Sequence, residues 1–401
     1  MLSLRLLFYS LTILILGLAV ALRISWQEKD QILPKNQPAK LIATLKKEPR
    51  IYDGQQVLEV GDGRVYVDLY PRYKVGDRLK IEGEVDSEGR ISGAKVERIS
   101  VGNNFMSQLR LRIWEKISQL LPSREATLVS GTVLGVDTIE KEFRDQLIRT
   151  GTIHVVVVSG QNLMIVAGVF LSLVKLIGRR QSILLATGAT FFYAALTGFE
   201  PPVVRATLMV LASTMAIVFG REVMPLWSLL LIALLIIFIW PQAIGEISFQ
   251  LTFAATLGIM TLGQKLTKIF SFQFSICNLI KNNAAIAVSA YIFTAPIIFY
   301  YFGRVSILSP IANIFVVEAI SPVMALGFLI AILSLIFMPL AQILAYIAYI
   351  PAFYFVKVVD IFARIPVGQI DLGKGNWGMV VGFYMLLGLL MFIWMRKSKS
   401  K

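Results

Sequence analysis

Polar residues interrupt an apolar stretch that begins at His154, and their types and spacing make this the best place in the sequence for chemistry. Four valines follow His154, and Ser159-Gly160-Gln161-Asn162 comes directly after them. Polar side chains at membrane depth are costly unless they face protein or water. Glycine also allows a helix to break, so that freed backbone amides line a cavity. The pattern predicts a polar constriction in a transport path, with hydrogen bonding between helices as the structural alternative.

The scarcity of histidine and cysteine excludes several kinds of site. His154 is the one histidine and Cys277 the one cysteine, so metal sites that need several histidines and disulfides within the chain are ruled out. No phosphate-binding Gly-x-x-x-x-Gly-Lys-Ser/Thr segment occurs. His154 and Ser159 could pair as in a serine hydrolase, but the sequence places no carboxylate nearby and no nucleophile-elbow pattern around the serine. We expect no enzymatic activity, no metal ion and no cofactor.

Further polar residues stand at the starts of apolar segments or inside them. Arg205 follows Glu200-Pro201-Pro202, where it could meet phosphates, pair with Glu200 or extend to the membrane surface. Gln250 lies one helical turn after Glu246. Glu318 could relay protons or pair with Arg205. The residues that we expect to line a path are His154, Ser159, Gly160, Gln161, Asn162, Arg205, Gln250, Asn313 and Glu318.

The composition indicates that these polar residues lie in membrane-spanning helices. Hydrophobic residues make up 56% of the 401, and the mean hydropathy is +0.70, whereas soluble chains contain about 45–50% apolar residues. The excess is concentrated after about residue 150, so the sequence predicts a polytopic α-helical membrane protein with a channel domain over 151–395. The stretches that we expect to cross the membrane are 155–177, 182–198, 203–219, 225–240, 247–263, 284–302, 322–338, 340–362 and 377–395.

A short apolar stretch over 306–319 carries Asn313 and Glu318, and we expect it to be a re-entrant or broken helix. Residues 1–23 predict an N-terminal transmembrane anchor, because 4–22 are apolar and long enough to span the bilayer. Ala19-Val20-Ala21 resembles a cleavage site, so a cleaved signal peptide is the alternative for this segment.

Residues 36–100 alternate between apolar and polar positions, with turn signals at Asp53-Gly54 and Asp62-Gly63. Five short strands in this length predict a small OB-like β-barrel after the first transmembrane helix. Its 12 Lys+Arg against 11 Asp+Glu leave a charge of only +1, so most of the chain's +14 lies elsewhere. A near-neutral barrel is a weak attractant for phosphate. The candidates for DNA binding, with ordinary surface as the alternative, are Tyr66, Lys74, Arg78, Lys80, Arg110 and Arg112.

Residues 105–150 predict a collar of three short helices lying on the bilayer. Ile113 and Ile117 share the apolar face of the first helix, while Arg110 and Arg112 lie opposite. Trp114 suits the membrane interface. The basic side chains of the collar could bind lipid headgroups or guide DNA, and anchoring to lipid suffices to explain them.

Five segments in order along the chain resemble the ComEC family of competence proteins. They are Gly131 to Gly135, Gly151 to Gly160, Val203 to Met209, Phe249 to Phe253 and Ser309 to Ile314. The resemblance extends over about residues 1–395 and implies a channel for DNA uptake in the cytoplasmic membrane. Many relatives carry a histidine where Asn162 stands here. Many also carry a C-terminal metallo-β-lactamase-like domain, which we do not expect in this chain.

We therefore expect a multi-pass channel of the cytoplasmic membrane that translocates single-stranded DNA during natural transformation. The alternative is a permease for a small molecule or lipid. A cytoplasmic N-terminus and an outer β domain satisfy the positive-inside rule and place the basic tail, 396–401, inside, provided that 306–319 does not span fully. The partners expected are single-stranded DNA, the lipid bilayer, a separate motor ATPase and a DNA-receptor protein. Any nuclease would be another chain.

Overall fold

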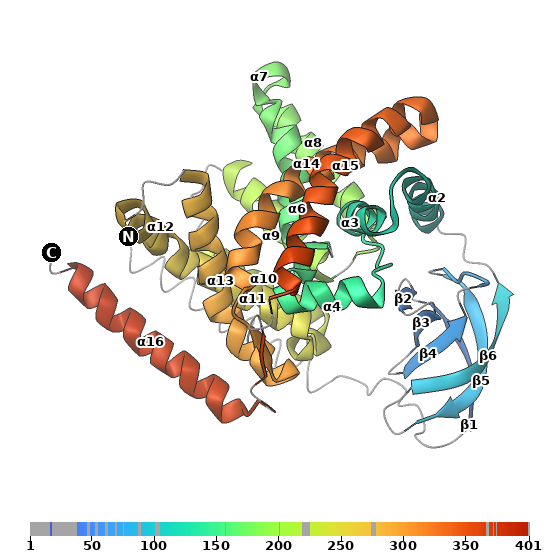
Figure 1. The fold of residues 1–401 in the computed structure, drawn as a ribbon, viewed down its shortest axis with the longest axis horizontal. Coiled ribbons are helices and arrows are strands. Elements are labelled where there is room, and N and C mark those ends of the chain that lie inside the picture. The colour runs from blue at the N-terminus through green and yellow to red at the C-terminus, as the bar shows by residue number, and fades with distance from the viewer. Residues whose placement is uncertain are drawn as a thin grey trace.

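The structure is a computed structural model, and the chain forms an N-terminal β domain followed by a larger helical domain (Figure 1). The anchor predicted over 1–23, apart from Gly17, lies outside the described residues, as do Glu200 and Cys277. The structure describes residues 17, 38–45, 49–52, 55–60, 63–68, 70–74, 76–86, 90–100, 105–156, 158–199, 201–218, 225–273, 278–365, 369–371, 373 and 375–399.

The β domain is one curled, six-stranded sheet with the strand order β1-β5-β6-β4-β3-β2. Neighbouring strands are antiparallel except for the parallel pair β4 and β6. Five strands match the prediction, and the extra one, β2, has too few residues to show alternation in the sequence. The strands are β1 (Pro38–Thr44), β2 (Arg50–Tyr52), β3 (Gln55–Val60), β4 (Gly63–Asp68), β5 (Arg78–Val85) and β6 (Arg90–Ser100).

Alternate residues of these strands point inward and form a separate small core that includes Leu58, Val65, Leu79 and Ile81. The buried carboxylate of Asp77 ties the strand connections together. It lies 3.1 Å from Nε of Arg98 and accepts a hydrogen bond from the backbone N–H of Lys74 at 3.0 Å. Tyr73 is buried in this core, and burial raises the pKa of its hydroxyl.

Each membrane span predicted after residue 150 coincides with one helix or with consecutive helices. The first is broken into three pieces, and the fifth continues through η2 into α12. The helical elements are α2 (Phe105–Leu120), α3 (Ser123–Leu134), α4 (Lys141–Thr150), α5 (Ile153–Val156), α6 (Gly160–Ser172), α7 (Val174–Ile177), α8 (Arg179–Leu196), α9 (Pro201–Val218), α10 (Pro225–Ile239), η1 (Pro241–Gly245), α11 (Ile247–Gly258), η2 (Ile259–Gly263), α12 (Gln264–Gln273), α13 (Asn278–Phe302), α14 (Ser309–Ile336), α15 (Met338–Ala363) and α16 (Trp377–Lys399). A small sheet of β7 (Arg304–Ser306) and β8 (Gln369–Asp371) joins the ends of α13 and α16.

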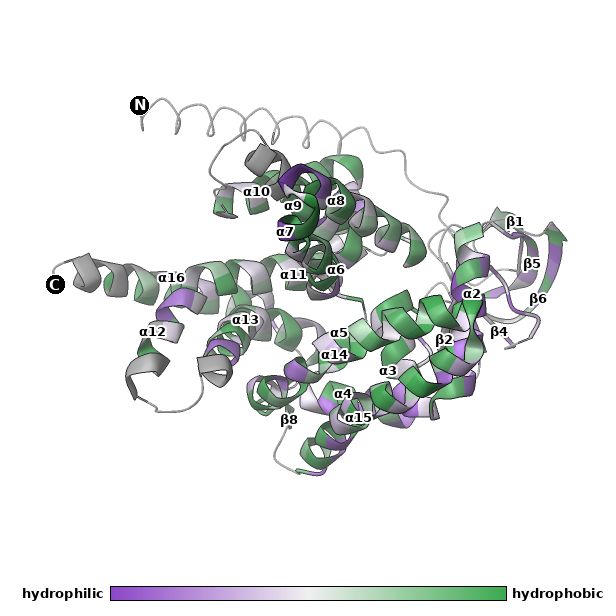
Figure 2. Ribbon diagram, turned by 90° about the horizontal axis from the view of Figure 1, so that it is seen from above, coloured by the Kyte–Doolittle hydropathy of each residue, from purple (hydrophilic) through white to green (hydrophobic). Residues whose placement is uncertain are grey.

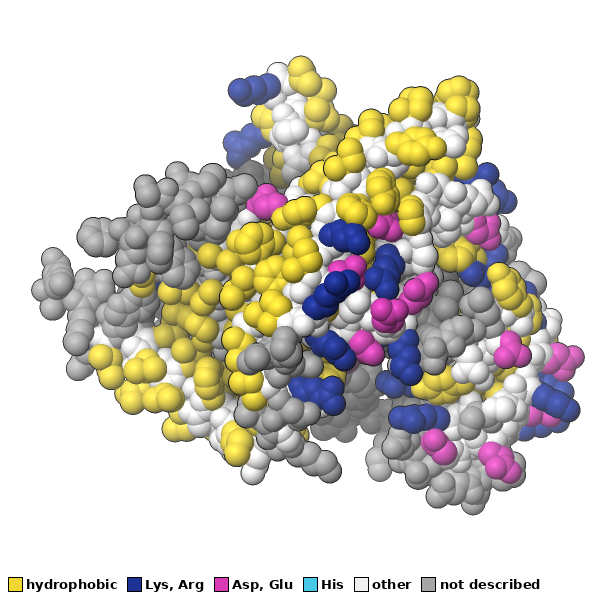
Figure 3. Space-filling model, viewed as in Figure 1, with side chains coloured by type: hydrophobic (Ala, Val, Ile, Leu, Met, Phe, Trp, Pro, Cys, Tyr) yellow, Lys and Arg dark blue, Asp and Glu magenta, His cyan; other side chains and the backbone are white. Residues whose placement is uncertain are grey.

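Among the described residues, three helices are long and apolar enough to cross a membrane: 282–302, 309–336 and 338–363. Their outer faces are predominantly apolar (Figure 2), and large side chains such as Ile336 and Ile343 stay exposed at 76% and 57%. Apolar side chains also cover much of the helical domain in the space-filling view, whereas charged ones gather beside them over α4 (Figure 3). Exposed apolar area of this extent indicates a membrane protein.

The prediction of a separate re-entrant segment over 306–319 is wrong. Ser309–Ile336 is one continuous α14 that passes through Pro322 without ending. A helix of 28 residues is about 42 Å long, which exceeds the roughly 30 Å of the hydrocarbon core. Because α14 takes the place of the predicted span 322–338, the number of expected crossings, and hence the predicted side of the tail, does not change.

The collar prediction also needs correction, because α3 does not lie on a surface. Every residue from Glu125 to Leu134 is buried, and α3 packs against α2, α14 and α15 in the main helical core. At Gly327 of α14, an added methyl group would lie 2.7 Å from a Val133 methyl, so the glycine allows the close contact between α14 and α3. The helix α3 is therefore a central element of the helical domain.

On α2, the predicted polar face is partly buried. Arg110 is only 2% exposed, and its guanidinium packs on Gly198 at the end of α8, so its assignment to a DNA-binding surface is wrong. The ring of Trp114 lies 4.1 Å beneath the guanidinium carbon of Arg72 and therefore faces the β domain instead of the predicted membrane interface. Arg112 is exposed, as predicted.

Candidate functional site at the break between α5 and α6

The helix interruption predicted from Ser159-Gly160 is present. Helix α5 ends at Val156 and α6 begins at Gly160, with Ser159 in an extended conformation at φ −123° and ψ 165°. No side chain caps the start of α6, and its first amides are of the kind that a helix leaves without intrahelical partners.

The break packs directly against the C-terminal end of α3, and glycines make the contact possible. A methyl group at Gly131 would collide with the carbonyl oxygen of Val156. Gly135 ends α3 in the left-handed conformation at φ +71°, and a methyl group there would lie 2.9 Å from a Val158 methyl. Two of the sequence segments that carry the family resemblance are therefore one packed unit.

The carbonyl of Thr132 is the polar centre of this contact. It belongs to the last turn of α3, where carbonyls lack intrahelical partners, and it accepts hydrogen bonds from Nδ2 of Asn162 at 3.1 Å and from the hydroxyl of Tyr193 at 2.8 Å. Ser159 donates to Oδ1 of Asn162 at 3.1 Å. Asn162 is 1% exposed. The expectation that Asn162 lines an open path is corrected, because its amide joins helices in the way that the structural alternative describes.

Removing the two donors to Thr132 tests this assignment. Asn162→Leu or Tyr193→Phe alone leaves the carbonyl one partner, so each should destabilise the protein by roughly 1 kcal/mol. The double variant leaves the buried carbonyl without a hydrogen-bond donor. It should lose more stability than the two single variants together, since an unsatisfied buried group costs about 1–3 kcal/mol. Thermal unfolding in detergent measures the effect. Strict additivity would contradict the shared role of the two side chains.

Arg205 is the second polar feature, on the other side of the break. It is 2% exposed in α9, and its Nη2 donates to three oxygens of α11: the Ser248 carbonyl at 3.0 Å, the Ser248 hydroxyl at 3.2 Å and the Thr252 hydroxyl at 2.6 Å. All three acceptors are neutral. Arg205 does not pair with Glu318, which instead accepts a hydrogen bond from Asn283. Glu246, just before α11, supplies electrostatic attraction to the guanidinium.

The break and Arg205 are in contact through small residues. A methyl group at Gly160 would lie 3.3 Å from Cβ of Ala206, the residue after Arg205. The end of α3, the break, α9 and α11 therefore form one continuous arrangement. Two more of the resemblance segments meet here. The Gly151–Gly160 segment contacts the Val203–Met209 segment, and Arg205 of the latter is hydrogen-bonded to α11, which carries the Phe249–Phe253 segment.

The remaining segment, at the start of α14, packs on the turn between α4 and α5. Gly151 has φ +68°, and a methyl group there would lie 2.5 Å from Cβ of Ser309. Ser306 donates to the carbonyl of Arg149 at 2.6 Å, and Asn313 donates to the Ser309 carbonyl at 2.8 Å. The buried Oδ1 of Asn313 has no hydrogen-bond partner among the described residues.

The other predicted path residues are not gathered into one described cluster. His154 is exposed on α5, Gln250 donates to the carbonyl of Ile244 at 2.9 Å, and Glu318 is exposed on α14. The side chain of Gln161 lies outside the described residues. Tyr193, by contrast, is central and was missed, because a single tyrosine in an apolar helix gives no signal of its partner.

On the β domain, Arg78 is exposed, while Tyr66 and Lys74 are half-buried. Lys80 is engaged in ion pairs with Glu82 at 3.3 Å and Glu97 at 3.6 Å, and the hydrogen bond to Glu82 raises the pKa of its ammonium group. An ammonium group that already pairs with two carboxylates is a weaker candidate for a phosphate contact than Arg78.

The fold defines a helical membrane protein with an N-terminal β domain, built around a helix break and a buried arginine. A family model described as "Competence protein" matches residues 133–397, and the chain belongs to this family. An uncharacterized protein of Aquifex aeolicus (strain VF5) is 36% identical over 114 residues, which are 28% of this chain and 27% of that relative. The match therefore spans about a quarter of the relative's length. No solved structure matches the chain.

Proposed function

We propose that the protein is a channel that carries single-stranded DNA across the cytoplasmic membrane during natural transformation. Membership of the Competence protein family points to a role in DNA uptake. The observation that carries the finer proposal is Arg205, a buried cation whose hydrogen bonds all go to neutral oxygens of α11 in the part of the chain that the structure describes.

An arginine remains charged in a protein interior, and burying a charge is costly unless it is compensated. The hydroxyls of Ser248 and Thr252 offer dipoles only, and Glu246 attracts the guanidinium without a described ion pair at hydrogen-bonding distance. A phosphate of DNA would complete this environment, because guanidinium and phosphate form strong charge-assisted hydrogen bonds. Arg205 would thus stabilise the polyanion where it crosses the apolar layer.

The path is closed in this conformation, since the break packs against α3 and α9. Opening would separate α6 from α9 at Gly160 and Ala206, where the contact consists of small groups. Small groups have little contact area and separate at low cost. The polar atoms of Ser159 and the uncapped start of α6 would then face the strand, next to Arg205.

The β domain would receive DNA on the outer side of the membrane. An OB-like barrel is favoured by the sheet order, because the two edge strands, β1 and β2, follow each other in the chain and can close the sheet. Its exposed Arg78, with Arg112 on α2, offers contacts to phosphate. The driving force would come from a separate motor ATPase, with a DNA receptor and any nuclease on other chains. The C-terminal tail would be cytoplasmic.

Deleting the gene and following doubly labelled DNA tests the proposal. We expect normal binding of duplex DNA at the cell surface, loss of DNA that resists added nuclease, and recovery of both uptake and transformation with the wild-type gene. Undiminished transformation in the deletion strain would contradict the channel. That result, with a change in the uptake of a small solute or lipid, would favour a permease.

A further inference from the structure

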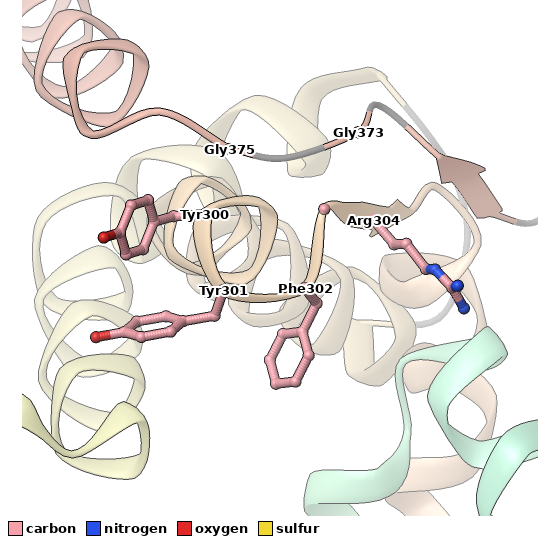
Figure 4. A pocket seen from close by; sticks show the side chains of 7 residues that line it. Tyr300, Tyr301, Phe302, Arg304, Gly373 and Gly375 are labelled. Atoms are coloured by element: carbon pink, nitrogen blue, oxygen red, sulfur yellow. The ribbon is translucent and has the colours of Figure 1, made fainter. Parts of the chain in front are cut away.

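A cavity of about 600 Å³ lies at the C-terminal end of α13. It is formed by the last turn of α13, the start of β7 and the chain that leads into α16 (Figure 4). Its volume falls within the range of sites that hold small organic groups. The described residues that line it are Tyr300, Tyr301, Phe302, Gly303, Arg304, Gly373 and Gly375.

Glycines bring the two walls of this cavity together. Gly303 has φ +66°, and a methyl group there would lie 2.6 Å from the carbonyl oxygen of Gly373, which itself has φ +76°. A methyl group at Gly375 would lie 2.5 Å from Cα of Tyr300. Direct backbone contact on both sides means that the shape of the cavity is fixed by the main chain.

The lining has an unusual composition for this protein. Its described residues are aromatic rings, glycines and an arginine, whereas exposed leucines and isoleucines are common elsewhere on the helical domain. Tyr300 and Tyr301 are in edge-to-face contact at 5.0 Å, and Trp377 at the start of α16 lies 5.1 Å from Tyr300. Such a lining favours a flat, unsaturated ring over an acyl chain.

The arginine adds a preference for an anion. Arg304 is exposed on β7, and its guanidinium points away from the two tyrosine rings, on the other side of Phe302 (Figure 4). A ligand that touches both the rings and the guanidinium must therefore be extended and must carry flat rings as well as negative charge. A strand of nucleotides has these properties, since each base offers a π-face and each linkage a phosphate.

We propose that this aromatic–arginine cavity is a base-stacking site for single-stranded DNA at the C-terminal end of α13. The inference rests on the proposed function, because the strand that it binds is the strand in transit. Tyrosine, tryptophan and arginine also gather at membrane interfaces, and a lipid-facing role is the outcome that the test must separate.

The test compares two ligands of equal charge with the full-length protein in detergent: an oligothymidylate and an abasic oligomer of the same length. We expect the wild type to bind the oligothymidylate at least about fivefold more tightly, the lower end of what stacking of one base contributes. Tyr300→Leu/Tyr301→Leu should remove the preference. Tyr300→Phe/Tyr301→Phe should keep it, as should Tyr346→Leu, which alters a tyrosine that is 71% exposed on α15.

Equal binding of both ligands by the wild type would overturn the inference. So would a preference that survives in the double leucine variant, or a loss of co-purifying anionic phospholipid in that variant with the preference intact. The deletion experiment decides the proposed function separately, because it depends on DNA uptake in cells and not on any residue of this cavity.

Discussion

Arg205→Gln should reduce the uptake of nuclease-resistant DNA by about a hundredfold or more, while the protein still reaches the membrane. The glutamine retains hydrogen bonding to Ser248 and Thr252 but removes the positive charge. Loss of one partner from a buried charged contact costs about 3–5 kcal/mol, and each 1.4 kcal/mol corresponds to a tenfold change. The measurement is internalised label in a deletion strain that expresses the variant, normalised to the amount of folded protein in the membrane.

The control is Arg205→Lys, which keeps the charge and loses the planar fork of donors. We expect it to retain a clear fraction of the uptake. If Arg205 merely joins α9 to α11, both variants should instead lower the unfolding temperature, and the surviving folded protein should take up DNA normally. Normal uptake with Arg205→Gln would contradict the role of this cation in transport.

Gly151→Ala should strongly destabilise the helical domain, lowering the free energy of unfolding by several kcal/mol. Gly151 has φ +68°, a conformation that costs a non-glycine residue about 1–2 kcal/mol. The new methyl group would also lie 2.5 Å from Cβ of Ser309, and overpacking of a tight contact costs typically 1–3 kcal/mol. Thermal unfolding of the purified protein in detergent measures the loss.

Two variants complete this test. Gly168→Ala on α6 meets no atom within 4 Å and has no left-handed backbone, so it should leave stability unchanged or slightly raised. Adding Ser309→Gly to Gly151→Ala removes the obstructing side chain and should recover the part of the loss that comes from the clash. A double variant no more stable than Gly151→Ala would show that the contact with α14 is not the cause.

The local features of the helical domain could be predicted from the sequence, because each depends on a few neighbouring residues. The positions of the helices followed from the apolar stretches, and the position of the helix break followed from Ser159-Gly160. The partner of Asn162 could not be predicted in the same way, since the Thr132 carbonyl is 30 positions away and its lack of an intrahelical partner follows from where α3 ends. Only tertiary packing decides that contact.

The amphipathic pattern of α2 predicted the exposure of some of its polar side chains wrongly, because this helix packs against neighbours on more than one side. Arg110 and Arg112 both look like members of a polar face, yet α2 packs against the end of α8 and buries the first while exposing the second. The cavity beside Tyr300 was not predicted either. Gly373 and Gly375 follow Tyr300 by more than seventy positions, and nothing local indicates that their backbone lies on the end of α13.

Crosslinking to DNA in transit tests most directly whether the strand passes beside Arg205. A photoreactive amino acid at Met209, one helical turn beyond Arg205 on α9 and half-buried, should form adducts with labelled single-stranded DNA stalled during uptake. The same group at Leu386, which is 56% exposed on α16, should not. Adducts of DNA with Met209 but not with Leu386 would support a strand that passes beside Arg205. Equal crosslinking at both positions, or none at Met209 while uptake proceeds, would contradict it.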